Sequence, residues 1–385
     1  MELEIWWLLL CPLFFGMGWL AARIDMRTVL KHAMSIPSGF FKSLDALVEN
    51  KTDVAAEALN EVTRQQPGAL ELQLTLGKLY RRRGENDKAI RLHQSLLESP
   101  DLVSDSRNQI SFQLGLDFQN AGLVDRAEQI FNGLLESNMG KPSRQLLLGI
   151  YQQDRDWQKA IETARTLSHD QQTYQFEVAQ FFCELAQAAL FKSDLIQARQ
   201  YITEALQANK KCARASIILG DIEQKSNHYD EAIEAWQSIE KQNPEFLSMV
   251  AERLYDVYDE QGKAIAGLDL LIGYCKTFPQ LELVDLLYQK TLLLRGENAA
   301  IEVVRESAYR HPTLNNVYRL IEARITGLSP EGRQDAEVTR AVIAKTAQKT
   351  MMYRCKRCSF KSQVFFWHCP ACNEWESFTP NRVEI

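Results

Sequence analysis

The sequence of 385 residues lacks the short motifs that mark the common enzyme classes. It contains no HExxH motif, no glycine-rich loop that could hold phosphate groups, and no ordered serine, histidine and aspartate set. His93, His169, His228 and His311 have no carboxylate or cysteine partner at a spacing typical of a site, so we predict that they are packed or solvated. The chain is therefore predicted not to be an enzyme and to hold no organic cofactor.

The chain also has fewer basic than acidic residues. The chain has 44 Lys and Arg residues against 50 Asp and Glu, a net charge of −6 and an isoelectric point near 5.7. A surface with this balance repels a polyanion, so general binding to nucleic acid is excluded as a predicted function.

Cysteine is sparse, and its distribution is uneven. Of the eight cysteines, four are clustered near the carboxyl terminus, while Cys11, Cys183, Cys212 and Cys275 stand alone. A secreted domain held by disulfides is shorter and more evenly rich in cysteine. We therefore expect a reducing compartment and interpret the single cysteines as small apolar residues.

The amino terminus carries the longest uncharged run. Ile5 to Ala22 has 18 residues without a charge, which as a helix spans about 27 Å, close to the hydrocarbon thickness of a bilayer. Trp6, Trp7 and Trp19 lie towards its ends, where indole rings favour the membrane interface. Residues 1–22 are predicted to be a transmembrane anchor and residues 23–35 a juxtamembrane linker.

The charges that flank this run give its direction. The start "MELE" is acidic, whereas Arg23, Arg27 and Lys31 follow the run. Two alternatives to an anchor are a cleaved signal peptide and a buried core helix. A signal peptide needs a positively charged start, which this sequence lacks. The positive-inside rule places the bulk of the chain in the cytoplasm, anchored by a single span in the inner membrane.

A repeat runs through the middle of the chain. "LGKLY" at Leu76 and "LGLDF" at Leu114 are each followed by a polar turn and a second helical pattern. Successive gaps of 34, 38, 33, 38, 34, 34 and 34 residues separate alanines that share one position of the pattern, of which Ala266 is the least clear: Ala55, Ala89, Ala127, Ala160, Ala198, Ala232, Ala266 and Ala300. This is the tetratricopeptide period, so the sequence resembles the tetratricopeptide repeat family over residues 36–312, with about eight units.

The residue types suit pairs of antiparallel helices. A small residue in the first helix is expected to face the alanine of the second, with bulky side chains beside that contact. One pair cannot bury its apolar stripe alone, so the pairs stack into an all-α solenoid, whose groove in this family binds peptides or proteins. Residues 313–350 depart from the repeat, and we interpret them as capping helices.

Four cysteines near the carboxyl terminus have metal-ligand spacing. Cys355 and Cys358 form one Cys-x-x-Cys pair, and Cys369 and Cys372 form the second after ten residues. Each pair can direct two sulfurs at one point, and two pairs complete a tetrahedron around one Zn²⁺ or iron ion. Because no ligand position stays open, we predict a structural site within residues 351–385.

"YRCKRCSF" and "CPACNEW" resemble the metal-binding turns of rubredoxins, which implies a rubredoxin-like zinc-ribbon fold and leaves a redox relay as an alternative. The ten-residue spacer is shorter than in rubredoxins, and Ser359 and Asn373 stand where those turns usually carry glycine.

The segment 338–361 contains no acidic residue but has seven basic ones: Arg340, Lys345, Lys349, Arg354, Lys356, Arg357 and Lys361. These charges either offset the negative charge of a metal–tetrathiolate centre or contact an acidic partner, lipid headgroups or the acidic solenoid of the same chain.

The order of anchor, tetratricopeptide solenoid and rubredoxin-like module resembles the lipopolysaccharide assembly protein B family (LapB, also called YciM) of Gram-negative bacteria over essentially the whole chain. The resemblance implies an inner-membrane adaptor that restrains lipopolysaccharide synthesis by bringing the deacetylase LpxC to the membrane protease FtsH. Its partners would be these and other envelope-assembly proteins. A general envelope scaffold without a proteolytic role is the alternative, and homo-oligomer formation stays open.

Overall fold

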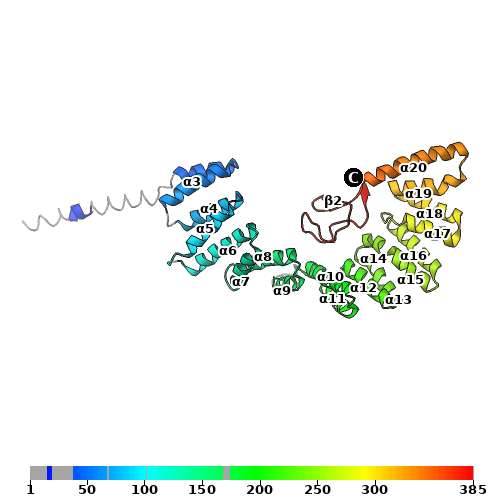
Figure 1. Ribbon diagram of the computed structural model, residues 1–385, viewed down its shortest axis with the longest axis horizontal. Helices are drawn as coiled ribbons and strands as arrows, with labels where there is room; N and C mark the ends of the chain where they lie inside the picture. The colour runs from blue at the N-terminus through cyan, green and yellow to red at the C-terminus, as the bar shows by residue number, and fades with distance from the viewer. Residues whose placement is uncertain (1–14, 20–37, 67–68, 101, 168–173, 385) are drawn as a thin grey trace, which may run out of the picture. The chain divides into compact units, whose positions relative to one another are not determined.

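The computed structural model describes residues 15–19, 38–66, 69–100, 102–167 and 174–384 (Figure 1). The chain forms two compact units, residues 1–150 and 151–385. Among the described residues no helix has the length and apolar character needed to cross a bilayer, and most of the anchor predicted for residues 1–22 lies outside them.

The first unit is built from helix pairs. Each pair packs as a hairpin, and the unit ends within α8 at residue 150. Its helices are α2 (Ser38–Val48), α3 (Thr52–Gln65), α4 (Leu70–Arg82), α5 (Asn86–Leu97), α6 (Ser104–Asn120), α7 (Val124–Gly133) and α8 (Gly140–Gln153).

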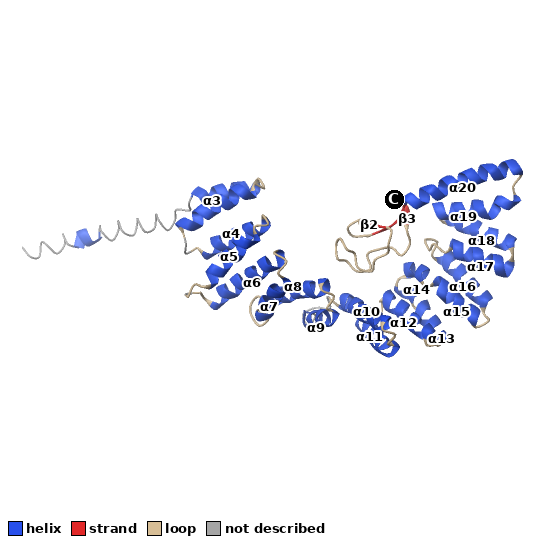
Figure 2. Ribbon diagram, viewed as in Figure 1, coloured by secondary structure: helices blue, strands red, loops and turns tan. Residues whose placement is uncertain are grey.

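The second unit continues the pattern and ends in a small sheet (Figure 2). Its helices are α9 (Trp157–Leu167), α10 (Gln175–Phe191), α11 (Leu195–Ala208), α12 (Ala213–Lys225), α13 (Tyr229–Gln237), α14 (Ile239–Gln242), η2 (Pro244–Met249), α15 (Ala251–Glu260), α16 (Ala264–Thr277), α17 (Val284–Arg295), α18 (Glu297–Arg310), α19 (Leu314–Arg324), η3 (Ile325–Gly327) and α20 (Pro330–Thr350). The predicted all-α solenoid of tetratricopeptide type is confirmed.

The turns between the two helices of several pairs share one backbone conformation. Gly84, Gly122 and Gly262 have positive φ, and Asn50 and Asn227 occupy the same place with φ of 56° and 60°. The next residue in each case donates its backbone N–H to a carbonyl five positions earlier, at 2.8 to 2.9 Å. This bond is the Schellman closure of a helix end. It recurs with the repeat, so local turn chemistry marks the same period as the alanines.

Seven of the eight alanines used to define the repeat are fully buried, but the exception corrects one assignment. Ala266 is exposed, and the adjacent Gly267 is buried in its place. A Cβ atom on Gly267 would lie 2.7 Å from the Cβ of Tyr258 on the preceding helix. The two helices cross too closely there for alanine, which explains why the alanine pattern failed at this unit.

Glycines in the first helix of three units face rings, not the alanines that we expected. A Cβ on Gly77, Gly115 or Gly220 would meet a ring of the residue sixteen positions later, which is His93, Phe131 or Trp236. The ring of Trp236 is fully buried, and its Nε1 donates to the carbonyl of Ile217 at 3.3 Å. The small residue therefore makes room for a large planar side chain.

This packing predicts that Gly220→Ala destabilises the second unit. The new methyl group would lie 2.2 Å from the indole Nε1 of Trp236, so the ring must shift, which costs about 1–3 kcal/mol in a packed core. Gly273→Ala in α16 is the matched control, because nothing lies within 4 Å of its Cβ and alanine favours a helix by about 0.5–1 kcal/mol. Urea unfolding should show opposite shifts in the two variants. Equal shifts would contradict the proposed packing.

The carboxyl-terminal segment forms a three-stranded antiparallel sheet in the order β2-β1-β3. Strand β1 (Met351–Arg354) follows α20 without a break and pairs with β2 (Lys361–Ser362) and β3 (Val383–Glu384). In Figure 1 this segment lies within the arc of the helices of the second unit, and side-chain contacts with α9, α10, α12 and η2 hold it there.

Candidate metal centre

Two similar turns carry the four cysteines. The backbone N–H of Ser359 donates to the carbonyl of Cys355 at 3.0 Å, and that of Asn373 donates to the carbonyl of Cys369 at 2.9 Å. Ser359 and Asn373 have φ of 63° and 56°. They stand where rubredoxin turns usually carry glycine, and they adopt the left-handed conformation that glycine favours. The replacement of glycine therefore leaves the turn geometry intact.

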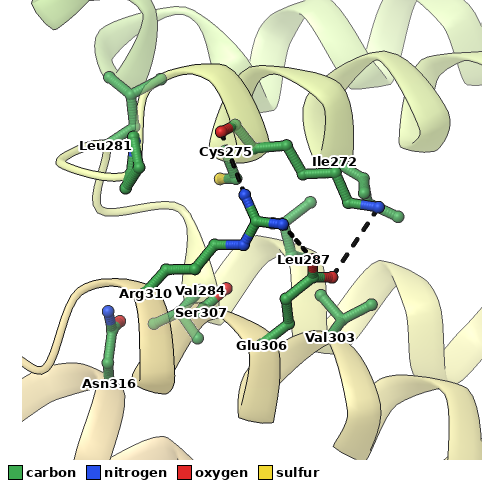
Figure 3. A pocket seen from close by; sticks show the side chains of 12 residues that line it. Ile272, Cys275, Leu281, Val284, Leu287, Val303, Glu306, Ser307, Arg310 and Asn316 are labelled. Atoms are coloured by element: carbon green, nitrogen blue, oxygen red, sulfur yellow. Dashed lines mark hydrogen bonds and ion pairs between the residues drawn. The ribbon is translucent and has the colours of Figure 1, made fainter.

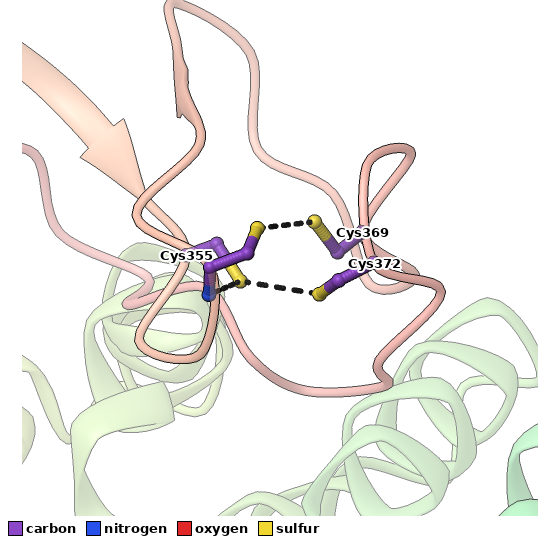
Figure 4. Close-up of side chains that lie close together, drawn as sticks. Cys355, Cys369 and Cys372 are labelled. Carbon is purple, nitrogen blue, oxygen red and sulfur yellow. Dashed lines mark hydrogen bonds between the residues drawn. The ribbon is translucent and has the colours of Figure 1, made fainter. Parts of the chain in front are cut away.

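The four sulfur atoms converge on one point. All lie within 4.8 Å of one another, with 3.8 Å between the Sγ atoms of Cys355 and Cys372 and 3.7 Å between those of Cys358 and Cys369 (Figure 4). A tetrahedron with metal–sulfur bonds of about 2.3 Å has edges of about 3.8 Å. The cysteines thus fit one tetrahedral ion, and the predicted site of one Zn²⁺ or iron ion is confirmed.

Hydrogen bonding distinguishes the thiols. Burial raises the pKa of Cys355, but N–H groups of its own turn and the hydroxyl of Ser377, whose Oγ lies 3.3 Å away, outweigh this effect and lower the pKa to about 6. Burial and the neighbouring thiols raise the pKa of Cys372 to about 12. Four thiolates so close together repel one another, so a bound cation is needed to keep all of them ionised.

Aromatic residues cover one side of the site, whereas Cys358 is exposed and Cys372 is partly exposed. Cys355 and Cys369 are fully buried and pack against Phe378, whose ring receives edge contacts from Phe360, Phe365 and Phe366 at 5.8 to 6.4 Å. Four protein ligands leave no coordination position for substrate, which is the arrangement of structural metal sites. We call residues 351–384 the metal module.

Two tryptophans attach the metal module to the helices. Trp375 contacts Trp157 of α9 and Phe181 of α10 edge-on, at centroid distances of 6.0 and 6.1 Å. Trp367 stacks on Phe246 of η2 at 5.0 Å. Aromatic pairs in these geometries each contribute about 0.5–1.5 kcal/mol beyond the area that they bury. With Phe365, whose ring lies edge-on to Phe246 at 6.4 Å, the interface has an apolar centre of six rings.

Arg214 of α12 lies beneath both tryptophans. Its side chain is 1% exposed, and its guanidinium lies 5.2 Å from the ring centroid of Trp367 and 5.8 Å from that of Trp375. It also donates to Glu184 at 2.7 Å and to Gln187 at 2.8 Å. A cation over two indoles, held by groups of α10, couples the helices to the metal module.

Polar contacts surround this centre. Gln180 of α10 donates to Glu376 at 2.7 Å, and burial raises the pKa of that carboxyl. Asn381 donates to the carbonyl of Gln280 at 3.0 Å. The contacts tie the metal module to two separate points of the second unit, which fixes its orientation as well as its position.

The basic segment 338–361 is partly neutralised by the chain itself. Lys356 pairs with Glu245 of η2 at 2.8 Å, Arg340 lies 3.6 Å from Glu322, and Arg357 pairs with Glu374. Contact with the acidic solenoid, one of the alternatives that the sequence left open, is found for Lys356, whereas the partners of Arg340 and Arg357 lie in the capping helices and in the carboxyl-terminal segment itself.

Three of the single cysteines, Cys183, Cys212 and Cys275, lie in the helical core, whereas Cys11 lies outside the described residues. Cys183 and Cys212 are fully buried with their sulfurs 4.0 Å apart, a contact that sequence reasoning missed. Cys275 lines a cavity of about 20 Å³ between α16, α17 and α18, closed on one side by Arg310, which donates to Glu306 at 2.7 Å (Figure 3). Burial raises the pKa of Cys275 to about 12, so this thiol is a poor nucleophile at neutral pH.

Two histidines have carboxylate partners that the sequence did not indicate. His93 is fully buried and bonds through Nδ1 to the buried Asp117, which also accepts from Arg81 at 2.6 Å. His228 lies 3.0 Å from Glu223. His169 lies outside the described residues. The sixteen-residue spacing from Gly77 to His93, which equals that from Gly220 to Trp236, could have shown that His93 fills a ring position of the core.

Family models match both parts of the chain. A model described as "Rubredoxin metal binding domain" matches residues 353–380, and one described as "Tetratricopeptide repeat" matches residues 42–101 and 183–245. A crystal structure of a tetratricopeptide repeat protein from Parabacteroides merdae ATCC 43184 is 18% identical, with a TM-score of 0.24, over 74% of this chain and 96% of its own.

Similar chains span the full length. Lipopolysaccharide assembly protein B of Escherichia coli (strain K12) is 32% identical over 389 aligned residues, covering 99% of this chain and 98% of that protein. The protein of the same name from Haemophilus influenzae is 27% identical, covering 97% of each. With this identity over nearly the whole of both chains, and with the four sulfur ligands in place, the chain belongs to the lipopolysaccharide assembly protein B family.

Proposed function

We propose that this protein is a non-enzymatic adaptor of lipopolysaccharide assembly that acts by holding other proteins in place. The observation that carries the proposal is the attachment of the metal module to the helices through Trp367, Trp375 and Arg214, which makes the second unit a stiff scaffold. Family membership supports the link to lipopolysaccharide, and a closed tetrathiolate site supports a structural role for the metal.

More specifically, we propose that the adaptor brings the deacetylase LpxC to the membrane protease FtsH. Proteolysis of LpxC then lowers lipopolysaccharide synthesis. Residues 1–22 would anchor the adaptor in the inner membrane with the helices on the cytoplasmic side. The uncharged run Ile5 to Ala22 and the basic residues after it support this placement. Anchoring raises the effective concentration of the adaptor beside a membrane protease, without any new contact.

The test is the half-life of LpxC in cells that carry the full chain or a chain without residues 1–22. Because linked binding commonly gains 10²–10⁴-fold in avidity, we expect a several-fold longer half-life when the anchor is absent. A chain whose residues 5–22 are replaced by an unrelated apolar helix of equal length should restore rapid turnover. An unchanged half-life with the truncated protein found in the soluble fraction would refute the role of anchoring. Crosslinking that recovers envelope proteins but neither LpxC nor FtsH would favour a general scaffold.

A further inference from the structure

Helix α2, the first helix of the solenoid, has two different faces. Ser43 and Ala46 are buried at 2% and 5% exposure, and Leu47 packs with them on the apolar residues of α3. The opposite side is apolar as well: Phe41 is 55% exposed, Leu44 42% and Val48 86%.

The three exposed side chains form one stripe. Positions i, i+3 and i+7 lie along the same side of a helix, so Phe41, Leu44 and Val48 extend over about 10 Å of the axis. We call these three residues the α2 stripe. The ring of Phe41 is held edge-on to Phe40 at 6.1 Å, so one end of the stripe has a fixed position.

A terminal helix of a solenoid usually needs a polar outer face, because no further repeat covers it. The exposed residues of the neighbouring helix α3 include the acidic Asp53, Glu57 and Glu61, with Val54 as a single exposed large apolar residue. The α2 stripe departs from this rule. Three large apolar residues in line on an end helix therefore suggest that something other than water contacts this face.

We propose that the α2 stripe lies on the surface of a phospholipid bilayer, an inference that rests on the anchor in the proposed function. Fifteen residues separate Ala22 from Ser38, so α2 begins within about 50 Å of the end of the apolar run. That linker carries Arg23, Arg27 and Lys31 against Asp25, an excess of positive charge that acidic headgroups attract.

The composition of α2 suits this contact. Lys42 and Asp45 are its only charged residues, so the helix carries no net charge that would oppose approach to acidic lipids. An amphipathic helix binds with its apolar face about 5–10 Å below the headgroup surface, and aromatic rings favour that depth. Because a single weak membrane signal gives reversible binding, the stripe would add orientation to the anchor: it fixes which side of the first unit faces the bilayer.

The test uses the full chain in vesicles of phosphatidylethanolamine and phosphatidylglycerol. A photoreactive benzoylphenylalanine replaces Leu44 or Val48 in turn, and Glu57 on the polar side of α3 serves as the matched control. After irradiation, mass spectrometry measures lipid adducts. We expect several-fold more adduct at positions 44 and 48 than at 57, and a loss of this excess when the other two stripe residues are changed to serine.

Each contrary result overturns the proposal. Crosslinked dimers would show that a second copy covers the stripe, and a crosslink to residues 1–37 would show that the chain's own amino-terminal segment does. Equal adduct formation at 44 and 57 would remove the basis for a specific face. Alkaline carbonate extraction distinguishes failure of the stripe proposal from failure of the anchor proposal. Protein that stays in the membrane fraction but forms no lipid adducts overturns only the stripe proposal. Protein that is released from the membrane overturns both the stripe and the anchor proposals. The half-life of LpxC tests the adaptor role independently.

Discussion

Replacing Cys355 with serine is expected to release the metal and to unfold the metal module. The module is shorter than about 40 residues and has one small aromatic core around Phe378, so it cannot bury enough apolar surface to fold without the ion. Metal binding supplies about 10–16 kcal/mol in sites of this type, and loss of one thiolate should weaken the affinity by more than about 100-fold.

Two measurements check this expectation. Elemental analysis should find the variant without stoichiometric zinc or iron, and hydrogen exchange of residues 353–380 should rise to that of an unfolded chain. Cys275→Ser is the control, because Cys275 lies in the helical core away from the four sulfurs and its variant should keep the metal. A Cys355→Ser protein that loses its metal but keeps slow exchange would show that the helices, and not the ion, hold the module folded.

Replacing Arg214 with alanine is expected to detach the metal module while the metal stays bound. The change removes the cation beneath Trp367 and Trp375 and leaves the carboxylate of Glu184, 26% exposed, without its partner. Breaking a fully buried pair costs about 3–5 kcal/mol, and the partial exposure of Glu184 lowers that cost here. Lysine should not restore the attachment, since one ammonium cannot bond Glu184 and Gln187 while covering two indoles.

The decisive measurement is again hydrogen exchange, here in residues 365–376, together with metal content and the free energy of unfolding. Arg295→Ala is the matched control, because its ion pair with Asp269 is largely exposed and should contribute less than about 1 kcal/mol. Lower stability with unchanged exchange in residues 365–376 would mean that Arg214 supports only α10 and α12. Comparison of Cys355→Ser with Arg214→Ala then separates folding of the metal module from its attachment, and the half-life of LpxC shows which of the two the adaptor requires.

Much of the fold could be predicted from the sequence, because the repeat depends on residue types that recur at fixed positions within each unit. Small residues recur where two helices cross, and left-handed turn residues recur with the same period. The failure at Ala266 has a physical cause: at that crossing the Cβ of Tyr258 leaves no room for a methyl group, so Gly267 occupies the position. A pattern based on alanine alone cannot detect an exchange that depends on the distance between two backbones.

The sequence by itself determined the solenoid, the four metal ligands and the small size of the module that they hold, since each depends on residues close together in the chain. The tertiary structure decided where that module lies and what holds it. Gln180 and Glu376 are 196 positions apart, and Lys356 and Glu245 are 111 apart. Arg214 also contacts residues far away in the sequence, the indoles of Trp367 and Trp375. Its position in a helical repeat does not indicate these contacts. Contacts of this range follow from the curvature with which the repeats stack, and that curvature arises from many small packing angles that no short stretch of sequence specifies.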